Sequence, residues 1–178
     1  MRIISGFHKN RKINAPKSLP VRPTTDLAKE SLFNIINNTY NIEILNVLDL
    51  FSGTGNISYE FASRGANKII SIDNNFNCIK FIKQTSSKLL LNNIECKKMD
   101  SIKYLSSTKE KFDIIFADAP YSYQFLDLII IKIFNNSLLN ENGILILEHS
   151  DKNNFSNSKY FLNKKKYSSV NFSFFVKK

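Results

Sequence analysis

Residues 47–56, Val-Leu-Asp-Leu-Phe-Ser-Gly-Thr-Gly-Asn, join an apolar run to an acid and two glycines. Gly53 and Gly55 let the backbone turn sharply and approach a ligand where a Cβ would collide. The helix that follows would begin with free N–H groups directed at that ligand. This spacing predicts a site for a nucleotide-like cofactor. NAD-binding folds begin similarly with G-x-G-x-x-G, but the third position here is Ser58.

The acid in this run, Asp49, narrows the choice of cofactor. It lies four residues before Gly53, at the end of the apolar run. A carboxylate there would repel the pyrophosphate of a dinucleotide and attract a cationic group. S-adenosylmethionine carries an ammonium group, so we predict that its methionine end lies beside Asp49.

Two further acids follow later apolar runs. Asp73 is placed to accept hydrogen bonds from ribose hydroxyls, and Asp100 to accept one from an adenine amine. A single such aspartate is more often a solvated loop carboxylate, and Asp73 alone would suit NAD equally well. Three acids at three successive strand ends favour a common role. The predicted cofactor-binding residues are Asp49, Phe51, Gly53, Gly55, Asp73, Asn74, Asp100 and Ser101.

A fourth run ends in Asp118-Ala119-Pro120-Tyr121, the predicted catalytic segment. Pro120 fixes its own φ and restricts Ala119 to an extended conformation, so carbonyl groups are held outward. Asp118 and a backbone carbonyl can then accept both hydrogens of an exocyclic amine, and Tyr121 offers a ring for base stacking. This chemistry suits methyl transfer to the amine of a nucleobase. A plain strand-ending turn is the alternative reading of the segment.

The elements that must position these residues alternate regularly. Strand-like runs at 44–50, 68–73, 94–99, 112–117 and 143–148 are separated by segments with apolar residues at helical spacing. This alternation predicts an α/β fold with a doubly wound, mostly parallel sheet, whose ligand lies at the carboxyl ends of the strands. Runs at 160–166 and 168–178 predict an antiparallel edge.

The N-terminal region differs from this body. Residues 2–5 and 11–14 are predicted to pair as a hairpin, 15–23 read as an extended connector, and Thr24 or Thr25 caps the first helix. We therefore predict two parts, a basic hairpin and connector over 1–23 and a catalytic domain over 24–178.

Charge is concentrated at the two ends of the chain, whose net charge is +10. Residues 1–25 hold six Arg or Lys and no acid, while 151–178 hold seven Lys and one acid. This distribution predicts a nucleic-acid partner, although a general bias toward lysine would produce the same counts. Cys78 and Cys96 have no metal-ligand spacing and read as reduced residues of a cytoplasmic protein. No metal site or transmembrane segment is predicted.

Several of these motifs together resemble the RsmD-type methyltransferases, which modify N2 of a guanine in small-subunit (16S) ribosomal RNA. The resemblance implies a seven-stranded sheet with the seventh strand antiparallel, S-adenosylmethionine as methyl donor and an N-terminal hairpin that contacts RNA. The family usually has Asp-Pro-Pro followed by Tyr or Phe, whereas this chain has Ala119 at the first proline, which predicts a somewhat less rigid loop. The matching segments are 2–6, 11–12, 22–26, 30–34, 49–55 and 63–66.

The resemblance implies methylation of guanine N2 by a monomer acting on ribosomal RNA within an assembling small subunit. An adenine-N6 methyltransferase on DNA or RNA is the first alternative, because the same loop would serve either amine. A noncatalytic RNA-binding assembly factor is the second. The predicted RNA-binding residues are Arg2, Lys9, Arg11, Lys12 and Arg22.

Overall fold

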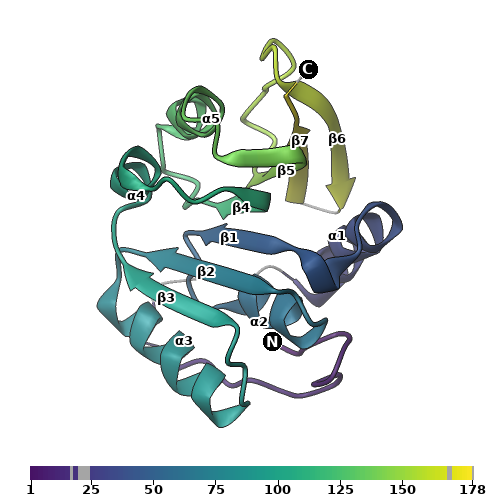
Figure 1. The fold of residues 1–178 in the computed structure, drawn as a ribbon, viewed down its shortest axis with the longest axis vertical. Helices are drawn as coiled ribbons and strands as arrows, with labels where there is room; N and C mark the ends of the chain where they lie inside the picture. Colours follow the sequence, from purple (N-terminus) through teal and green to yellow (C-terminus); the bar gives the residue numbers. More distant parts are fainter. Residues whose placement is uncertain (17, 20–24, 168–169, 178) are drawn as a thin grey trace.

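A seven-stranded sheet runs through the described part of the chain, which is residues 1–16, 18–19, 25–167 and 170–177 of this computed structural model (Figure 1). Its strand order is β3-β2-β1-β4-β5-β7-β6, with β7 antiparallel to both of its neighbours and the other pairs parallel. The predicted mostly parallel sheet with an antiparallel edge is confirmed. The strands are β1 (Asn46–Leu50), β2 (Lys68–Asp73), β3 (Ile94–Lys98), β4 (Phe112–Asp118), β5 (Leu139–His149), β6 (Phe161–Tyr167) and β7 (Val170–Phe175).

Helices cover both faces of the sheet, as the doubly wound prediction requires. Alternate strand residues bury on opposite faces, so Val47 packs in one apolar cluster and its neighbour Leu48 in the other. The first cluster includes residues of α1 (Asp26–Thr39), α2 (Asn56–Ser63) and α3 (Phe76–Lys88), and the second includes residues of α4 (Ser101–Ser107) and α5 (Leu126–Asn135). None of the helices in the described ranges is long and apolar enough to cross a membrane.

Two predicted strand boundaries were wrong. The first strand begins at Asn46 rather than 44, because Ile42–Ile44 form a 3-10 turn whose preceding Asn41 side chain accepts a hydrogen bond from the Glu43 amide at 3.3 Å. The fifth strand begins at Leu139 rather than 143 and reaches His149. The prediction missed residues 139–142 because it relied on apolar runs and three of these four residues are polar.

The N-terminal segment 1–16 packs against α2, near which Figure 1 shows it in purple. The predicted hairpin pairs at one isolated antiparallel bridge, Arg2 with Lys12, rather than along two strands. The Phe7 amide donates to the Ser63 carbonyl at 2.7 Å, while the Ser63 hydroxyl donates to the Ser5 carbonyl at 2.6 Å. The segment is therefore fixed to the end of α2 by backbone contacts.

A buried ion pair joins α1 to α2 beneath this segment. The Lys29 ammonium lies 3.3 Å from the Glu60 carboxylate, and both side chains are fully buried. Glu60 also accepts hydrogen bonds from the amides of Ile4 and Ser5 at 2.8 and 3.0 Å, and Lys29 donates to the Arg2 carbonyl at 2.7 Å. Burial lowers the pKa of Lys29, opposed by Glu60. Removing Glu60 would leave Lys29 buried without its ion-pair partner, whereas Glu60 also pairs with Arg64 at 2.9 Å.

Gly6 provides a test of how tightly the segment is held. At Gly6, with φ +82°, a Cβ would overlap the Ser63 carbonyl. At Gly65, with φ +87°, the nearest atom to a Cβ would be Glu43 Cγ at 3.5 Å. Gly65→Ala should therefore cost only about 1–2 kcal/mol for its left-handed backbone. We expect Gly6→Ala to cost at least about 2 kcal/mol more, because the segment must move away from α2. Urea unfolding of both variants measures the difference; equal losses would show that the segment is only loosely held.

Candidate active site

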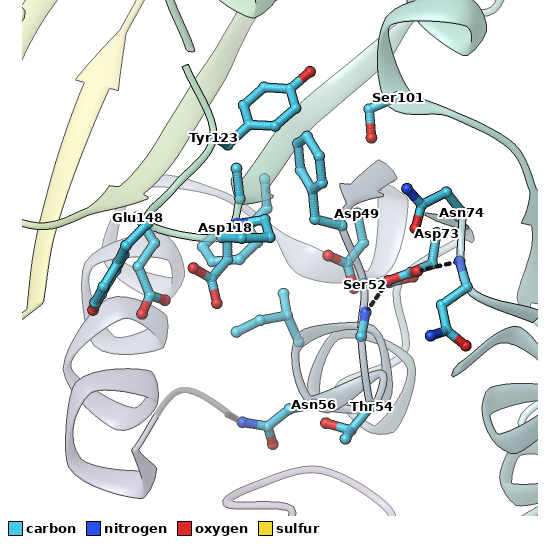
Figure 2. A pocket seen from close by; sticks show the side chains of 18 of the residues that line it. Asp49, Ser52, Thr54, Asn56, Asp73, Asn74, Ser101, Asp118, Tyr123 and Glu148 are labelled. Carbon is cyan, nitrogen blue, oxygen red and sulfur yellow. Dashed lines mark hydrogen bonds between the residues drawn. The ribbon is translucent and has the colours of Figure 1, made fainter. Parts of the chain in front are cut away.

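A pocket with a volume of about 520 Å³ opens at the carboxyl ends of β1, β2, β4 and β5 (Figure 2). This is where ligands bind in open α/β sheets, and its volume is within the usual range for small-molecule sites. The structure brings eleven of the predicted cofactor and catalytic residues to this pocket, and the remaining one, Gly55, lies behind it at the start of α2. The eleven are Asp49, Phe51, Gly53, Asp73, Asn74, Asp100, Ser101, Asp118, Ala119, Pro120 and Tyr121.

Strand register places four carboxylates of the pocket on one face of the sheet. Asp49 of β1 is level with Phe116 of β4, so Asp118, two residues further on, shares the face of Asp49. Asp118 is in turn the direct partner of Glu148 on β5. Asp49 also pairs with Ser71 of β2, so Asp73, two residues beyond Ser71, lies on this face as well. On this face the strands begin with apolar residues and end with acids, which concentrates negative charge at one edge of the core.

The turn after β1 is held by Asp73. Its carboxylate accepts hydrogen bonds from the amides of Gly53 and Asn75, both at 2.8 Å. Gly55 begins α2 with φ +80°, and a Cβ there would come within 2.8 Å of the Tyr59 ring, so glycine is required for both conformation and space. Asp73 thus has a structural task that its sequence position did not reveal. Its role toward a ribose stays a prediction.

Asp49 is buried at the floor of the pocket. It accepts a hydrogen bond from the Ser58 hydroxyl at 2.5 Å, and Ser58 in turn lies 2.7 Å from the Ser71 hydroxyl. Burial raises the pKa of Asp49 to about 7, with the Asp73 charge adding to the rise and the Ser58 hydrogen bond opposing it. A cationic ligand group nearby would favour the ionised form. The carboxylate is therefore suited to an ammonium group and unsuited to a phosphate.

The start of α4 forms the wall on the β3 side. The side chain of Asp100 caps this helix by accepting from the Lys103 amide at 2.9 Å, and Ser101 is buried beside it. Asn74 lies exposed at the rim. The expected contact of Asp100 with an adenine amine stays a prediction.

The segment after β4 forms the opposite wall. Ala119 is buried, whereas Pro120 and Tyr121 are exposed at the mouth, with Tyr121 67% exposed. The Pro120 carbonyl accepts from the Tyr123 amide at 2.7 Å, which closes a tight turn. The Tyr123 ring meets the edge of Phe51 at 5.0 Å between centroids.

Phe51, which lines the pocket from the turn after β1, has φ +59°, a left-handed conformation that is costly for a bulky side chain. Such strain at a pocket wall is typical of functional sites, and it holds the ring of Phe51 over the pocket.

Asp118 ionises less readily than an ordinary aspartate. Burial raises the pKa of Asp118 well above its usual range, and the nearby charges of Glu148 and Asp49 raise it further. Figure 2 shows Glu148, Asp118 and Asp49 following one another across the pocket. Sequence reasoning missed Glu148, although it ends the fifth predicted strand just as Asp49 and Asp73 end theirs. It also missed Thr25, Asn56 and Tyr123, which line the pocket from loops and a helix start.

Four of the five predicted RNA-binding residues are described by the structure, and these four do not line the pocket. Arg2, Lys9, Arg11 and Lys12 are exposed on the N-terminal segment, and Arg2 lies 3.6 Å from the Asp26 carboxylate. Arg22 falls outside the described residues. The structure thus separates a compact acidic pocket from an exposed basic segment.

Comparisons with known proteins agree on one family. The family model described as conserved hypothetical protein 95 matches residues 1–176. The ribosomal RNA small subunit methyltransferase D of Buchnera aphidicola (subsp. Baizongia pistaciae) is 32% identical over 151 residues, covering 85% of this chain and 76% of that protein.

Two solved structures extend the comparison. The putative methyltransferase yhhF from Escherichia coli has a TM-score of 0.87 at 22% identity, covering 98% of this chain and 96% of that one, which supports the fold. The structure of PKMT2 from Rickettsia typhi in complex with AdoHcy has a TM-score of 0.53 at 30% identity, covering 61% of this chain and 22% of that one.

The raised pKa of Asp49 predicts a stability effect in the ligand-free protein. The folded pKa of about 7 lies above the ordinary value of 3.8. The free energy of unfolding is therefore lost as pH rises between these two values, and it stays reduced at higher pH. Asp49→Asn should therefore gain on the order of 2 kcal/mol in unfolding free energy over wild type between pH 5 and pH 8. Urea unfolding at several pH values measures this, with the exposed Asp127→Asn as control. Parallel curves for wild type and Asp49→Asn would contradict the assignment.

Proposed function

The chain belongs to the RsmD-type methyltransferase family, and from this premise we propose that it methylates the exocyclic N2 amine of a guanine in small-subunit ribosomal RNA. Family membership and the name of the Buchnera relative support the broader activity, methylation of ribosomal RNA with S-adenosylmethionine. The observation that carries the choice of an exocyclic amine is the meeting of the Asp118–Tyr121 segment with the Gly53 turn in one pocket.

The pocket suits the methyl donor in charge as well as size. S-adenosylmethionine supplies an electrophilic methyl group on a positively charged sulfur. Asp49 would lie beside the ammonium group of the donor, because that charge stabilises the ionised form of a buried carboxylate whose pKa is about 7. Asp73 would accept from the ribose, while Asp100 and Ser101 would border the adenine. This assignment lays the methionine, ribose and adenine parts of the donor along the ends of β1, β2 and β3, in that order.

The residues after β4 present the base. Asp118 and a neighbouring backbone carbonyl would accept the two N2 hydrogens, which directs the nitrogen lone pair toward the methyl group instead of the ring. Tyr121, exposed at the mouth, would stack on the base. Asp118 is the stronger acceptor when ionised, so we expect activity to fall as pH is lowered through its raised pKa. No strong base is required, because an aryl amine nitrogen becomes acidic once it is methylated.

Basic residues outside the pocket would hold the RNA. Arg11 and Lys12 are exposed on the N-terminal segment, and Lys164–Lys166 are exposed on the edge strand β6. Phosphate contacts of this kind position nucleic acid without reading its sequence. We place the reaction in the cytoplasm, with a monomer acting on an assembling small subunit.

A methylation assay tests the function directly. Purified protein with labelled S-adenosylmethionine should convert guanine in unmodified small-subunit RNA to N2-methylguanosine, identified by mass spectrometry of digested nucleosides. Asp118→Ala should lower turnover at least about 1000-fold with cofactor and RNA still bound, because it removes an acceptor used in positioning. The exposed Asp127→Ala should behave as wild type. Methylated adenine would establish the adenine-N6 alternative, and absence of cofactor binding would favour the noncatalytic one.

Charge reversal tests the RNA contact. The double change Arg11→Glu and Lys12→Glu should weaken RNA binding. It should also lower the magnitude of the slope of log affinity against log salt by about 1 to 2, because fewer phosphate contacts release fewer counterions on binding. Cofactor affinity should not change. The matched control reverses Lys109 and Lys111, which are exposed just before β4, the central strand of the sheet. If both pairs weaken RNA binding equally, the effect is one of net charge and the N-terminal contact is refuted.

A further inference from the structure

Glu148 is a buried acid in the pocket, at the end of β5, and the mechanism above does not use it. It is only 4% exposed and lines the same pocket as Asp118. The two residues are direct partners across the parallel pair β4 and β5, whose backbones lie about 4.8 Å apart. Figure 2 shows both side chains in the pocket next to each other. A base whose amine reaches Asp118 would therefore lie close to Glu148.

We propose that Glu148 determines the specificity for guanine by accepting a hydrogen bond from the ring N1–H next to the N2 amine. This inference rests on the proposed function and goes one step further, because it assigns the choice of base to one side chain. Asp118 would then position the amine and Glu148 would identify the ring that carries it.

The chemistry of the bases supports this assignment. Three RNA bases carry an exocyclic amine, and each presents a different ring atom beside it. Adenine has an unprotonated N1 and cytosine an unprotonated N3, so both would direct a lone pair at the carboxylate, which is an acceptor only. Guanine has an N–H donor at N1. Its other neighbouring atom, N3, is an acceptor, so Glu148 favours one orientation of guanine as well as guanine itself.

The electrostatics of the pocket fit the same conclusion. Glu148 adds to the repulsion that raises the pKa of Asp118, so a second acid at this position opposes the ionised state that Asp118 needs. A guanine provides N–H donors to both carboxylates at once, whereas adenine or cytosine would leave Glu148 facing a lone pair. Sites that hydrogen-bond a particular donor discriminate strongly against analogues that lack it.

A change in the substrate base tests the proposal. The probe is an RNA oligonucleotide with guanine, or with 2-aminopurine, at the nucleotide found methylated in the assay above. 2-Aminopurine keeps the 2-amino group but lacks O6 and has an unprotonated N1, so the response of the preference to the Glu148 variants isolates the N1 contact. Wild-type protein should prefer guanine by about 100-fold in kcat/KM. Glu148→Gln should narrow this preference to less than about tenfold, because the amide NH2 can donate to the unprotonated N1.

Binding measurements separate specificity from general damage. The fluorescence of 2-aminopurine reports its uptake into the pocket, and Glu148→Gln should tighten that uptake while calorimetry shows unchanged affinity for S-adenosylmethionine. Glu148→Asp, which withdraws the carboxylate, should lose guanine turnover without gaining 2-aminopurine turnover, and it serves as the second variant if Glu148→Gln does not fold. Glu141→Gln, an exposed glutamate on the same strand, is the matched control.

The outcomes distinguish the role of Glu148 from the proposed function. Suppose that wild-type protein methylates guanine RNA but Glu148→Gln keeps the full preference, or loses activity on both bases equally. The role of Glu148 would then be refuted and the proposed function would stand. Wild-type protein that methylates neither RNA would refute the proposed function itself.

Discussion

Desolvation and mutual repulsion of closely placed carboxylates are the constraint on which this pocket depends. Asp49, Asp118 and Glu148 are brought to one edge of the sheet by strand register, and register cannot shift by one residue without turning every apolar side chain of the strand to the wrong face. The apolar core therefore holds the acids where they raise the pKa of Asp118. In the proposed function, the ammonium group of the cofactor beside Asp49 and the N–H donors of guanine beside the other two would relieve that repulsion.

A second buried acid, Glu60 of α2, is stabilised by opposite charges instead of being destabilised by like charges. The buried charge of Glu60 is balanced by Lys29 and Arg64, and Glu60 also accepts from two backbone amides of the N-terminal segment. Lys29 also donates to Asn56, which lines the pocket, at 2.7 Å. One hydrogen-bonded network thus connects the segment proposed to hold RNA with the floor of the pocket. The sequence alone suggested a separable basic appendage, because charge patterning is visible in a sequence and a tertiary ion pair is not.

Periodicity made the architecture predictable, since buried parallel strands and amphipathic helices leave distinct patterns. The strand-end acids and glycines were predictable for the same reason, because parallel strands end at a common edge. Contacts that depend on the folded chain were not predictable. Asp73 holds the Gly53 turn and Asp100 caps α4, tasks that neither residue's position indicates. Glu148 was overlooked for a different reason, since the acid carries no motif and acquires meaning only from its pairing with Asp118.

Ala119 shows how packing substitutes for covalent stiffness. The family usually has proline at this position, which would restrict the loop through its ring. Here Ala119 is 4% exposed and packs in the apolar cluster with α5 residues, and the loop beyond it is closed by the Tyr123 amide on the Pro120 carbonyl. The Tyr123 ring then rests against Phe51 of the glycine turn, so the segment that presents the base is held by the turn that borders the cofactor. Aromatic packing across the pocket therefore joins its two halves, in addition to the pairing of β1 with β4.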